Sequence, residues 1–275
     1  GFLVYQFGLM GFTYITVSLL VCGIVALITS LFLLKNKEKI ARLCGMMMLS
    51  AAIWGVAYGM QFTSSSLQAS LPWIFVSYFG VSTLPPLWLI FASTFAGKVG
   101  WLTPKRRLLL FLLPFVTIVM VGTNSYHELH YKDLTLKLDG PLPVLNFKAG
   151  IWYKITMLYQ YSLLAIGAYL MVQKYRQSDA IFRKQNLIML VGVFLPVIFN
   201  VFYLAGFQPA GLSIDITPFA FIVSCIVIAF GLMRYQLFDI VPVARERIVE
   251  AMTDGILVTD TSGRIVDVYP AIKRM

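Results

Sequence analysis

The run PFAFIVSCIVIAFGLM, residues 218–233, carries no charged side chain, whereas the segment that follows it, RYQLFDIVPVARERIVEAMTDGILVTD, residues 234–260, is charged and amphipathic. A helix of about 20 mostly apolar residues crosses the hydrocarbon core of a bilayer. No Gly/Ser-rich linker separates the two stretches. The sequence therefore predicts a membrane helix that continues directly into a cytosolic module, a junction suited to passing a mechanical change from a membrane bundle to an output domain.

The composition extends this interpretation to most of the chain. Of its 275 residues, 59% are hydrophobic and 12% are charged, which is too apolar for a water-soluble domain and is typical of a polytopic membrane protein. Seven runs are long and apolar enough to span a membrane: residues 13–34, 43–60, 72–96, 108–121, 152–172, 187–207 and 218–233. We therefore expect an all-α fold with a seven-helix transmembrane domain over residues 1–233.

The basic residues predict the orientation of these helices. All but four of the 22 Lys and Arg residues follow the first, third, fifth and seventh runs. Because basic residues concentrate on the cytoplasmic side of a membrane, the N-terminus is expected outside and the C-terminus in the cytoplasm. The net charge of +10 then lies on the cytoplasmic face, where we expect it to hold anionic lipid headgroups. Nothing in the sequence suggests a nucleic-acid partner.

The loop between the fourth and fifth runs, residues 122–151, is predicted to lie outside the cell. Its piece DLTLKLDGPLPVLNF alternates apolar and polar residues around a central Asp-Gly-Pro, a pattern that predicts a β-hairpin lid. An unstructured loop is the alternative. The same loop holds the two histidines of the chain, His127 and His130. Two histidines are too few to predict a metal site, so we interpret them as residues that hold the lid.

The interiors of the seven runs contain no charged residue and no histidine, which argues against an ion-coupled transporter or pump. A seventh run without Lys cannot form the Schiff base of a rhodopsin. Aromatic residues with a few uncharged polar groups are typical of a small-molecule pocket. The candidate ligand-binding residues are Trp54, Tyr58, Gln61, Tyr78, Tyr159, Asn200 and Tyr203. An aromatic belt at the membrane interface is the competing interpretation, and no catalytic residue is predicted.

Two further patterns predict helix contacts. Ala51, Gly55 and Gly59 form a stripe of small residues on the second run, which permits close packing within one bundle or, alternatively, between two chains. After the seventh run, apolar residues spaced by four and three form an a/d seam: Leu237, Val241, Ala244, Ile248 and Ala251. The seam predicts a short parallel coiled coil within a signalling helix over residues 234–253, although a helix packed on its own domain has the same period.

Residues 254–275 predict the start of a further domain. The stretch ILVTD, a Ser-Gly turn and the stretch RIVDVY together have the pattern of a second β-hairpin. Because a lone hairpin is not a stable domain, we expect the native chain to continue beyond it.

The segment LFDIVPVARERIVEAMTDGILVTDTSGRIVDVYP resembles the junction between the N-terminal seven-helix sensor region of bacterial histidine kinases and the PAS domain that follows it. Shorter motifs of the same family are found upstream: Trp54 with Tyr58, Tyr78-Phe79-Gly80, Pro85-Pro86-Leu87-Trp88 with Phe91, Trp101, and Thr123-Asn124 followed by His127. Asn124 is then expected in the lid beside the histidines. The family often has two adjacent histidines where this chain has His127-Glu128, and Asn before the proline where it has Tyr269-Pro270.

The resemblance implies a sensor in the inner membrane of a bacterium. It would detect a small-molecule or lipid-like signal, transmit it through the seventh helix and the coil to a PAS domain, and control a homodimeric kinase that autophosphorylates on histidine. ATP and Mg²⁺ are implied for that kinase and a response regulator as its partner, while no cofactor is implied for the present region. A diguanylate cyclase output is the alternative, and a transporter is the third hypothesis.

Overall fold

The computed structural model describes residues 2–138, 143–178, 180–205, 217–234, 257–259 and 265–268. The chain divides into two compact units, Gly1–Gly231 and Leu232–Met275, and each is described by itself.

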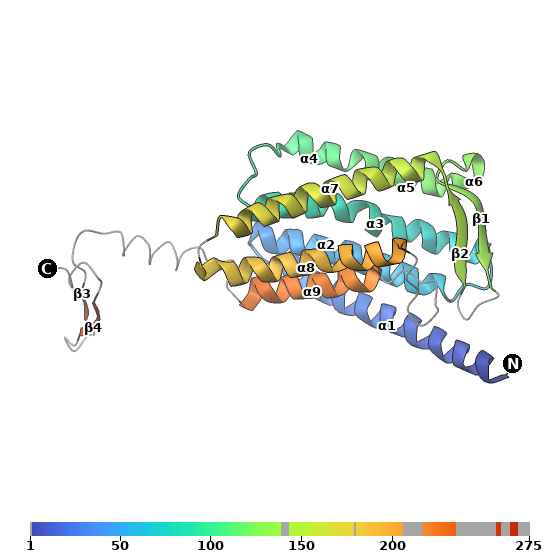
Figure 1. The fold of residues 1–275 in the computed structure, drawn as a ribbon, viewed down its shortest axis with the longest axis horizontal. Coiled ribbons are helices and arrows are strands. Elements are labelled where there is room, and N and C mark those ends of the chain that lie inside the picture. The colour runs from blue at the N-terminus through green and yellow to red at the C-terminus, as the bar shows by residue number, and fades with distance from the viewer. Residues whose placement is uncertain are drawn as a thin grey trace. The chain divides into compact units, whose positions relative to one another are not determined.

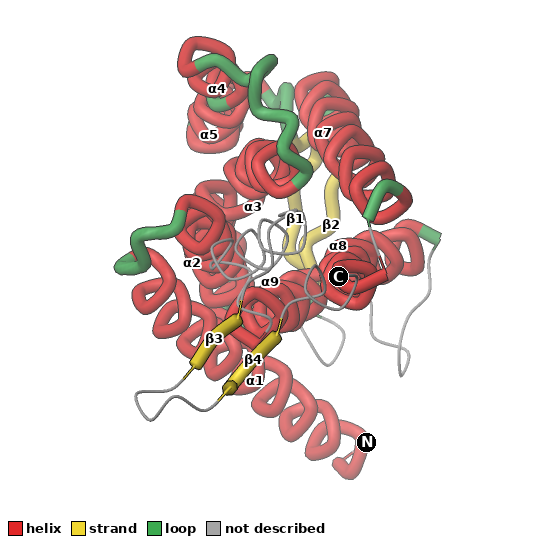
Figure 2. The backbone as a smooth tube through the Cα atoms, turned by 90° about the vertical axis from the view of Figure 1, so that its left-hand side faces the viewer, coloured by secondary structure: helices red, strands yellow, loops and turns green. Residues whose placement is uncertain are grey.

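The first unit is mostly helical and carries one small antiparallel sheet (Figure 1). Its helices are α1 (Phe2–Leu34), α2 (Lys39–Gln61), α3 (Leu67–Phe95), α4 (Pro104–Leu110), α5 (Leu112–Gly122), α6 (Asn124–His127), α7 (Ile151–Arg176), α8 (Ala180–Leu204) and α9 (Thr217–Arg234). Helix α3 is the central one, since it packs against α2, α5 and α7 (Figure 2).

Local sequence signals start several of these helices. Ser66 precedes α3, and its hydroxyl accepts a hydrogen bond from the Ala69 amide at 3.2 Å. Thr103 precedes α4 in an extended conformation, with Pro104 as the first helical residue. The first turn of a helix leaves several amide groups without an intrahelical partner. The Ser66 hydroxyl satisfies one of these groups in α3, and Pro104 removes one in α4.

Four of the described helical segments are long and apolar enough to cross a membrane: Tyr14–Leu34, Lys39–Gln61, Leu67–Phe95 and Ile151–Arg176. Two shorter apolar segments, Leu190–Phe202 and Thr217–Phe230, lie in α8 and α9. The protein is therefore a mostly helical membrane protein, and the count of seven spanning helices stays a prediction.

The fourth predicted run, residues 108–121, is not one continuous helix. It is divided between α4 and α5 at Phe111. Pro114 lies four residues after Leu110, where α4 ends, and a proline has no N–H to donate to that carbonyl. The Leu110 carbonyl instead accepts a hydrogen bond at 2.6 Å from the Tyr159 hydroxyl on α7. A neighbouring helix thus satisfies the backbone group that the proline leaves without a donor.

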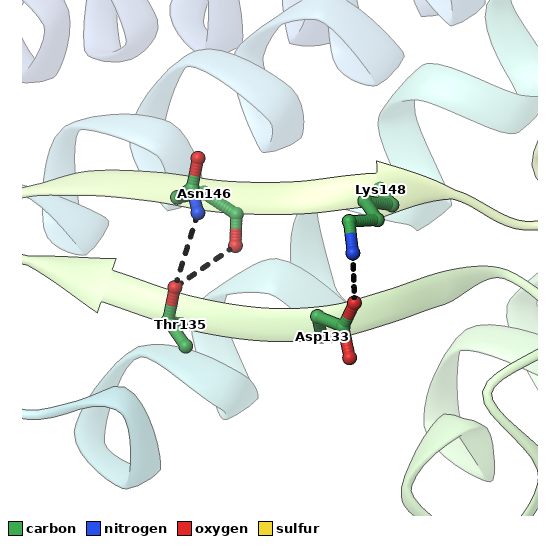
Figure 3. Close-up of polar contacts among 4 residues, drawn as sticks. All are labelled: Asp133, Thr135, Asn146 and Lys148. Atoms are coloured by element: carbon green, nitrogen blue, oxygen red, sulfur yellow. Dashed lines mark hydrogen bonds and ion pairs between the residues drawn. The ribbon is translucent and has the colours of Figure 1, made fainter.

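The predicted β-hairpin in the loop is confirmed. Strands β1 (Tyr131–Lys137) and β2 (Val144–Ala149) pair antiparallel, and the residues of the expected turn lie outside the described part of the chain. The register shifts between Lys132 and Thr135, and Asp133 at this irregularity has a φ of 51°. Its carboxylate reaches the Lys148 ammonium at 2.8 Å, and Thr135 bonds Asn146 further along the ladder (Figure 3).

The stripe of small residues packs inside the helical unit, as the first of the two interpretations predicted. A Cβ atom added at Gly55 would lie 2.8 Å from a methyl group of Ile222 on α9, and one added at Gly59 would lie 3.2 Å from Leu19 on α1. Ala51 is fully buried. These residues let α2 approach α1 on one side and α9 on the other.

In the second unit, β3 (Leu257–Thr259) pairs antiparallel with β4 (Ile265–Val268), as the strand pattern predicted. A PAS domain at this position stays a prediction. The five residues of the predicted seam, Leu237, Val241, Ala244, Ile248 and Ala251, lie outside the described residues.

Candidate functional site

A cavity of about 240 Å³ lies among the helices next to the β1–β2 hairpin. Its wall comes from five helices, α2, α3, α7, α8 and α9, and from both strands of the hairpin. The cavity therefore collects residues from segments that are up to about 170 positions apart in the sequence, between Trp54 and Phe221.

Five of the seven candidate ligand-binding residues line this cavity. They are Trp54, Tyr58, Gln61, Tyr78 and Asn200. Trp54 packs against Phe221 of α9 with ring centroids 5.5 Å apart, and Tyr58 packs edge-on against Phe62 at 4.8 Å. These contacts show that the aromatic residues of α2 pack against other parts of the helical unit.

Tyr159 and Tyr203 are placed differently. Tyr159 is not among the residues that line the cavity; it packs with Leu89, Leu163 and Leu170, and its hydroxyl donates to the Leu110 carbonyl. The Tyr159 hydroxyl thus satisfies a backbone carbonyl of α4. Tyr203 lies on α8, and its side chain is outside the described part of the structure.

The sequence-based selection left out several polar residues of the wall, among them Gln160, Tyr161 and Thr217. Gln160 and Tyr161 directly follow Tyr159 on α7, and a rotation of about 100° per residue separates their directions. An amide in an otherwise apolar run was the available signal for Gln160, because a buried amide in a membrane helix requires a polar environment.

The wall is apolar with a few uncharged polar groups. Among the cavity-lining residues of the described chain there is no Asp, Glu, Lys, Arg or His. Its hydrophobic part is formed by side chains such as Ile74, Val81, Leu84, Met157 and Leu164. Such a lining suits a small molecule without a net charge, because an unpaired charge in an apolar site is costly.

The hairpin covers one side of the cavity with Tyr131, Leu136, Val144, Leu145 and Phe147. The Tyr131 ring packs against Phe147 with centroids 4.4 Å apart. Its hydroxyl is hydrogen-bonded to the Tyr78 hydroxyl of α3 at 2.5 Å. This hydrogen bond therefore holds the hairpin to α3 at the wall of the cavity.

Asn124 and His130 hold the base of the hairpin. The Asn124 side-chain oxygen accepts hydrogen bonds from the amides of His130 and Tyr131, at 3.1 and 2.9 Å, and its nitrogen donates to the Tyr131 carbonyl. The His130 ring is fully buried, and its Nε2 is hydrogen-bonded to the Tyr78 hydroxyl at 2.8 Å. Burial, with a smaller contribution from His127, lowers the pKa of His130 to about 4.

His127 has a more local role than His130. It is half-buried, its Nδ1 accepts a hydrogen bond from the Leu129 amide at 3.0 Å, and its Nε2 is bonded to the Thr123 hydroxyl. These contacts stabilise the turn after α6, where Glu128 has a φ of 50°. The described residues contain no cluster of three or more His, Cys, Asp or Glu that could hold a metal ion.

A chain of hydrogen bonds in the cavity wall links the last three long helices. The Tyr161 hydroxyl of α7 donates to the Asn200 side-chain oxygen of α8. The Asn200 nitrogen donates to the Thr217 hydroxyl at 3.2 Å, and Thr217 is the first residue of α9. A second contact holds α8 to α9, since the Ser224 hydroxyl donates to the Gly192 carbonyl, four residues before Pro196.

A family model described as the N-terminal 7TM region of histidine kinase matches residues 15–242. This range includes every helix that contributes to the cavity. A search of curated proteins gave no match.

Proposed function

Because the chain belongs to the family of N-terminal seven-transmembrane regions of histidine kinases, we propose that it is the sensor region of a bacterial two-component system and that the cavity beside the hairpin binds the signal. The part of this proposal that makes the chain a membrane sensor region follows from its family. The identity of the binding site rests on the geometry of the cavity.

In the proposed topology, seven helices cross the inner membrane, with α4 and α5 together forming the fourth. The N-terminus and the hairpin lie outside the cell, and the C-terminus lies in the cytoplasm. The distribution of Lys and Arg supports this arrangement. The signal, a small molecule or a lipid-like compound, would reach the cavity from outside or from the bilayer, and lipids surround the helices.

The observation that carries the proposal is that α9 begins in the cavity wall. Thr217 and Phe221 line the cavity, Thr217 accepts the hydrogen bond from Asn200, and Phe221 contacts Trp54. A ligand that displaces any of these contacts changes the position of the helix that continues toward the second unit. A ligand can act in this way only through contacts that differ between the two positions.

Downstream of α9, Pro242 interrupts the seam, so a short coiled coil would start around Val243 in a homodimer and carry the change to a PAS domain and a kinase. That kinase would use ATP and Mg²⁺ to phosphorylate a histidine of its own and then pass the phosphoryl group to a response regulator. His127 and His130 are not that histidine, because in the proposed topology both lie outside the cell.

The test uses the full-length protein in membrane vesicles with ATP labelled at the γ-phosphate. Acid-labile, base-stable label on the protein identifies phosphohistidine. We expect Trp54→Ala and Asn200→Ala to change the steady-state label severalfold at unchanged expression, because each removes a contact between the cavity and α9. Thr94→Val is the matched control, since the Thr94 hydroxyl bonds only the Ile90 carbonyl of its own helix.

Two results would contradict the proposal in different ways. Label that is unchanged in both cavity variants would remove the cavity from signalling. The complete absence of label on a folded protein would reassign the output, for which a diguanylate cyclase assay with GTP is the next measurement.

A further inference from the structure

We propose that the cavity selects an uncharged, mostly apolar molecule that carries a hydrogen-bond acceptor, and that Gln160 is the residue that recognises this acceptor. The inference rests on the proposed function, because it specifies the ligand of the same site. It adds the chemical class of the ligand and one specificity-determining residue.

The wall excludes charged ligands by its composition. Of the ionisable side chains, only tyrosines occur among the residues that line the cavity in the described chain. A carboxylate, phosphate or ammonium ion that entered it would lose its hydration without gaining an opposite charge. The large apolar share of the wall instead favours a hydrocarbon chain or ring.

Gln160 supplies the polar recognition. Its side chain is 8% exposed, and its amide nitrogen has no hydrogen-bond partner in the structure. Of the buried polar side-chain atoms without a partner in the described residues, this nitrogen is the one whose residue is among those that line the cavity. A buried donor without a partner is unfavourable, so an acceptor on a ligand that bonds it gains more than the same acceptor would gain in water.

Three other polar residues of the wall, Asn200, Ser77 and Tyr78, already make hydrogen bonds within the protein. Both ends of the Asn200 amide are used, by Tyr161 and by Thr217. The Ser77 hydroxyl donates to the Ile74 carbonyl at 2.7 Å, and the Tyr78 hydroxyl bonds His130 and Tyr131. A ligand that bonded these groups would first have to break existing contacts, whereas Gln160 donates without such a loss.

The probes for the test are three ten-carbon compounds that differ in one functional group. They are 2-decanone, which has an acceptor and no donor; decane, which has neither; and decanoate, which is charged. Each is added to the protein in lipid nanodiscs at the same measured concentration in the lipid. Binding is followed by saturation-transfer NMR, and the carbonyl stretch of ¹³C-labelled 2-decanone is followed by infrared difference spectroscopy.

We expect saturable binding of 2-decanone, with a carbonyl stretch shifted to lower frequency by the hydrogen bond. Decane should bind about tenfold more weakly, the factor that corresponds to one lost hydrogen bond. Decanoate should also bind more weakly than 2-decanone, because its carboxylate would lose its hydration without gaining an opposite charge. Gln160→Met keeps the length of the side chain but removes the amide. It should remove the infrared shift and lower the affinity for 2-decanone to that for decane. Gln173→Met is the matched control, since Gln173 lies on the same helix outside the cavity lining.

Equal binding of 2-decanone and decane, tight binding of decanoate, or an infrared shift that survives Gln160→Met would overturn the assigned ligand class. These outcomes leave the proposed sensor function standing, because the Trp54 and Asn200 variants test that function through phosphorylation. No saturable binding of 2-decanone to a folded protein would also overturn the inference. Unchanged phosphorylation in the cavity variants would instead overturn the site on which it rests.

Discussion

At the residue scale, the two histidines of the loop show how neighbouring positions acquire different roles. His130 is fully buried against Tyr78, Tyr131 and Tyr153, whereas His127 is half-buried at a turn. Burial keeps His130 neutral, since a charged imidazolium there would lose its hydration. The buried ring then joins the hairpin to α3 through the Tyr78 hydroxyl.

This difference predicts a pH dependence of hairpin docking. The pKa of His130 is lowered from 6.5 to about 4, so between these values the opened state binds more protons than the docked state. The stabilisation of the docked hairpin by neutral His130 is fully present above pH 6.5. It decreases as the pH falls and is lost by about pH 4. The total change is on the order of 3 kcal/mol.

Thermal unfolding midpoints measured between pH 7.5 and pH 4.5 check this expectation. His130→Gln should flatten the pH dependence, and His127→Gln, the same substitution three residues earlier, should retain most of it, because burial is the larger cause of the lowered pKa of His130. An equal pH dependence in all three proteins would show that His130 is not the titrating group.

Tyr159 offers a second test at a single residue. Its hydroxyl donates to the Leu110 carbonyl, which Pro114 leaves without a backbone donor. Tyr159→Phe should therefore lower stability by about 1 kcal/mol. In a Pro114→Ala background, the restored amide at position 114 can donate to Leu110, so the same substitution should cost less. A double-mutant cycle on unfolding free energies measures the difference, and strictly additive effects would contradict the assignment.

At the scale of elements, the junction between β2 and α7 controls how the hairpin lies on the cavity. The Gly150 amide donates to the His130 carbonyl, and the Trp152 amide donates to the Leu129 carbonyl, both at 2.9 Å. A Cβ atom at Gly150 would lie 2.1 Å from the Leu129 carbonyl oxygen. The two backbones can approach this closely only because position 150 has no side chain.

Gly150→Ala should therefore force the base of the hairpin away from α7 and destabilise it by about 1–3 kcal/mol. Hydrogen exchange of the β1 and β2 amides is the direct measurement, and both strands should exchange faster. Gly100→Ala is the matched control, because a Cβ atom there meets no atom within 4 Å. Unchanged exchange in Gly150→Ala would mean that the hairpin is not held at this junction.

At the scale of the whole molecule, the proposed sensor depends on the heptad register of the seam that connects α9 to the output domain. The seam from Leu237 to Ala251 repeats every seven residues, so a dimeric coil would transmit a rotation only while that repeat is unbroken. The described helices provide the input side of this relation, since α9 begins in the cavity wall and leads toward the seam.

Insertion of one residue after Ala244 should lock the phosphorylation of the full-length protein in a high or a low state, because it shifts the seam by about 100°. Insertion of seven residues at the same place retains the phase and should preserve regulation. Label incorporation from ATP measures both variants. Regulated output in the one-residue variant would show that the linker does not act as a phased coil.

The sequence alone was sufficient for properties that depend on local pattern. The length and hydropathy of the runs predicted a helical membrane protein, the alternation in residues 133–147 predicted the hairpin, and the ordered motifs predicted the family, which is confirmed. Each of these signals is contained in a short window or in the order of windows along the chain. Five cavity residues were predicted for the same reason, since aromatic and amide groups are conspicuous in an apolar run.

Only the tertiary structure decided which side of a helix faces the cavity. Helix α7 carries apolar residues both on the side that packs against other helices and on its exposed side, for example Leu158 and Ile166, so its sequence does not distinguish Tyr159 from Gln160. The break at Phe111, the burial of His130 rather than His127, and the bond from Asn200 to Thr217 depend in the same way on partners distant in sequence. These contacts are set by how the helices cross, a property that no single segment contains.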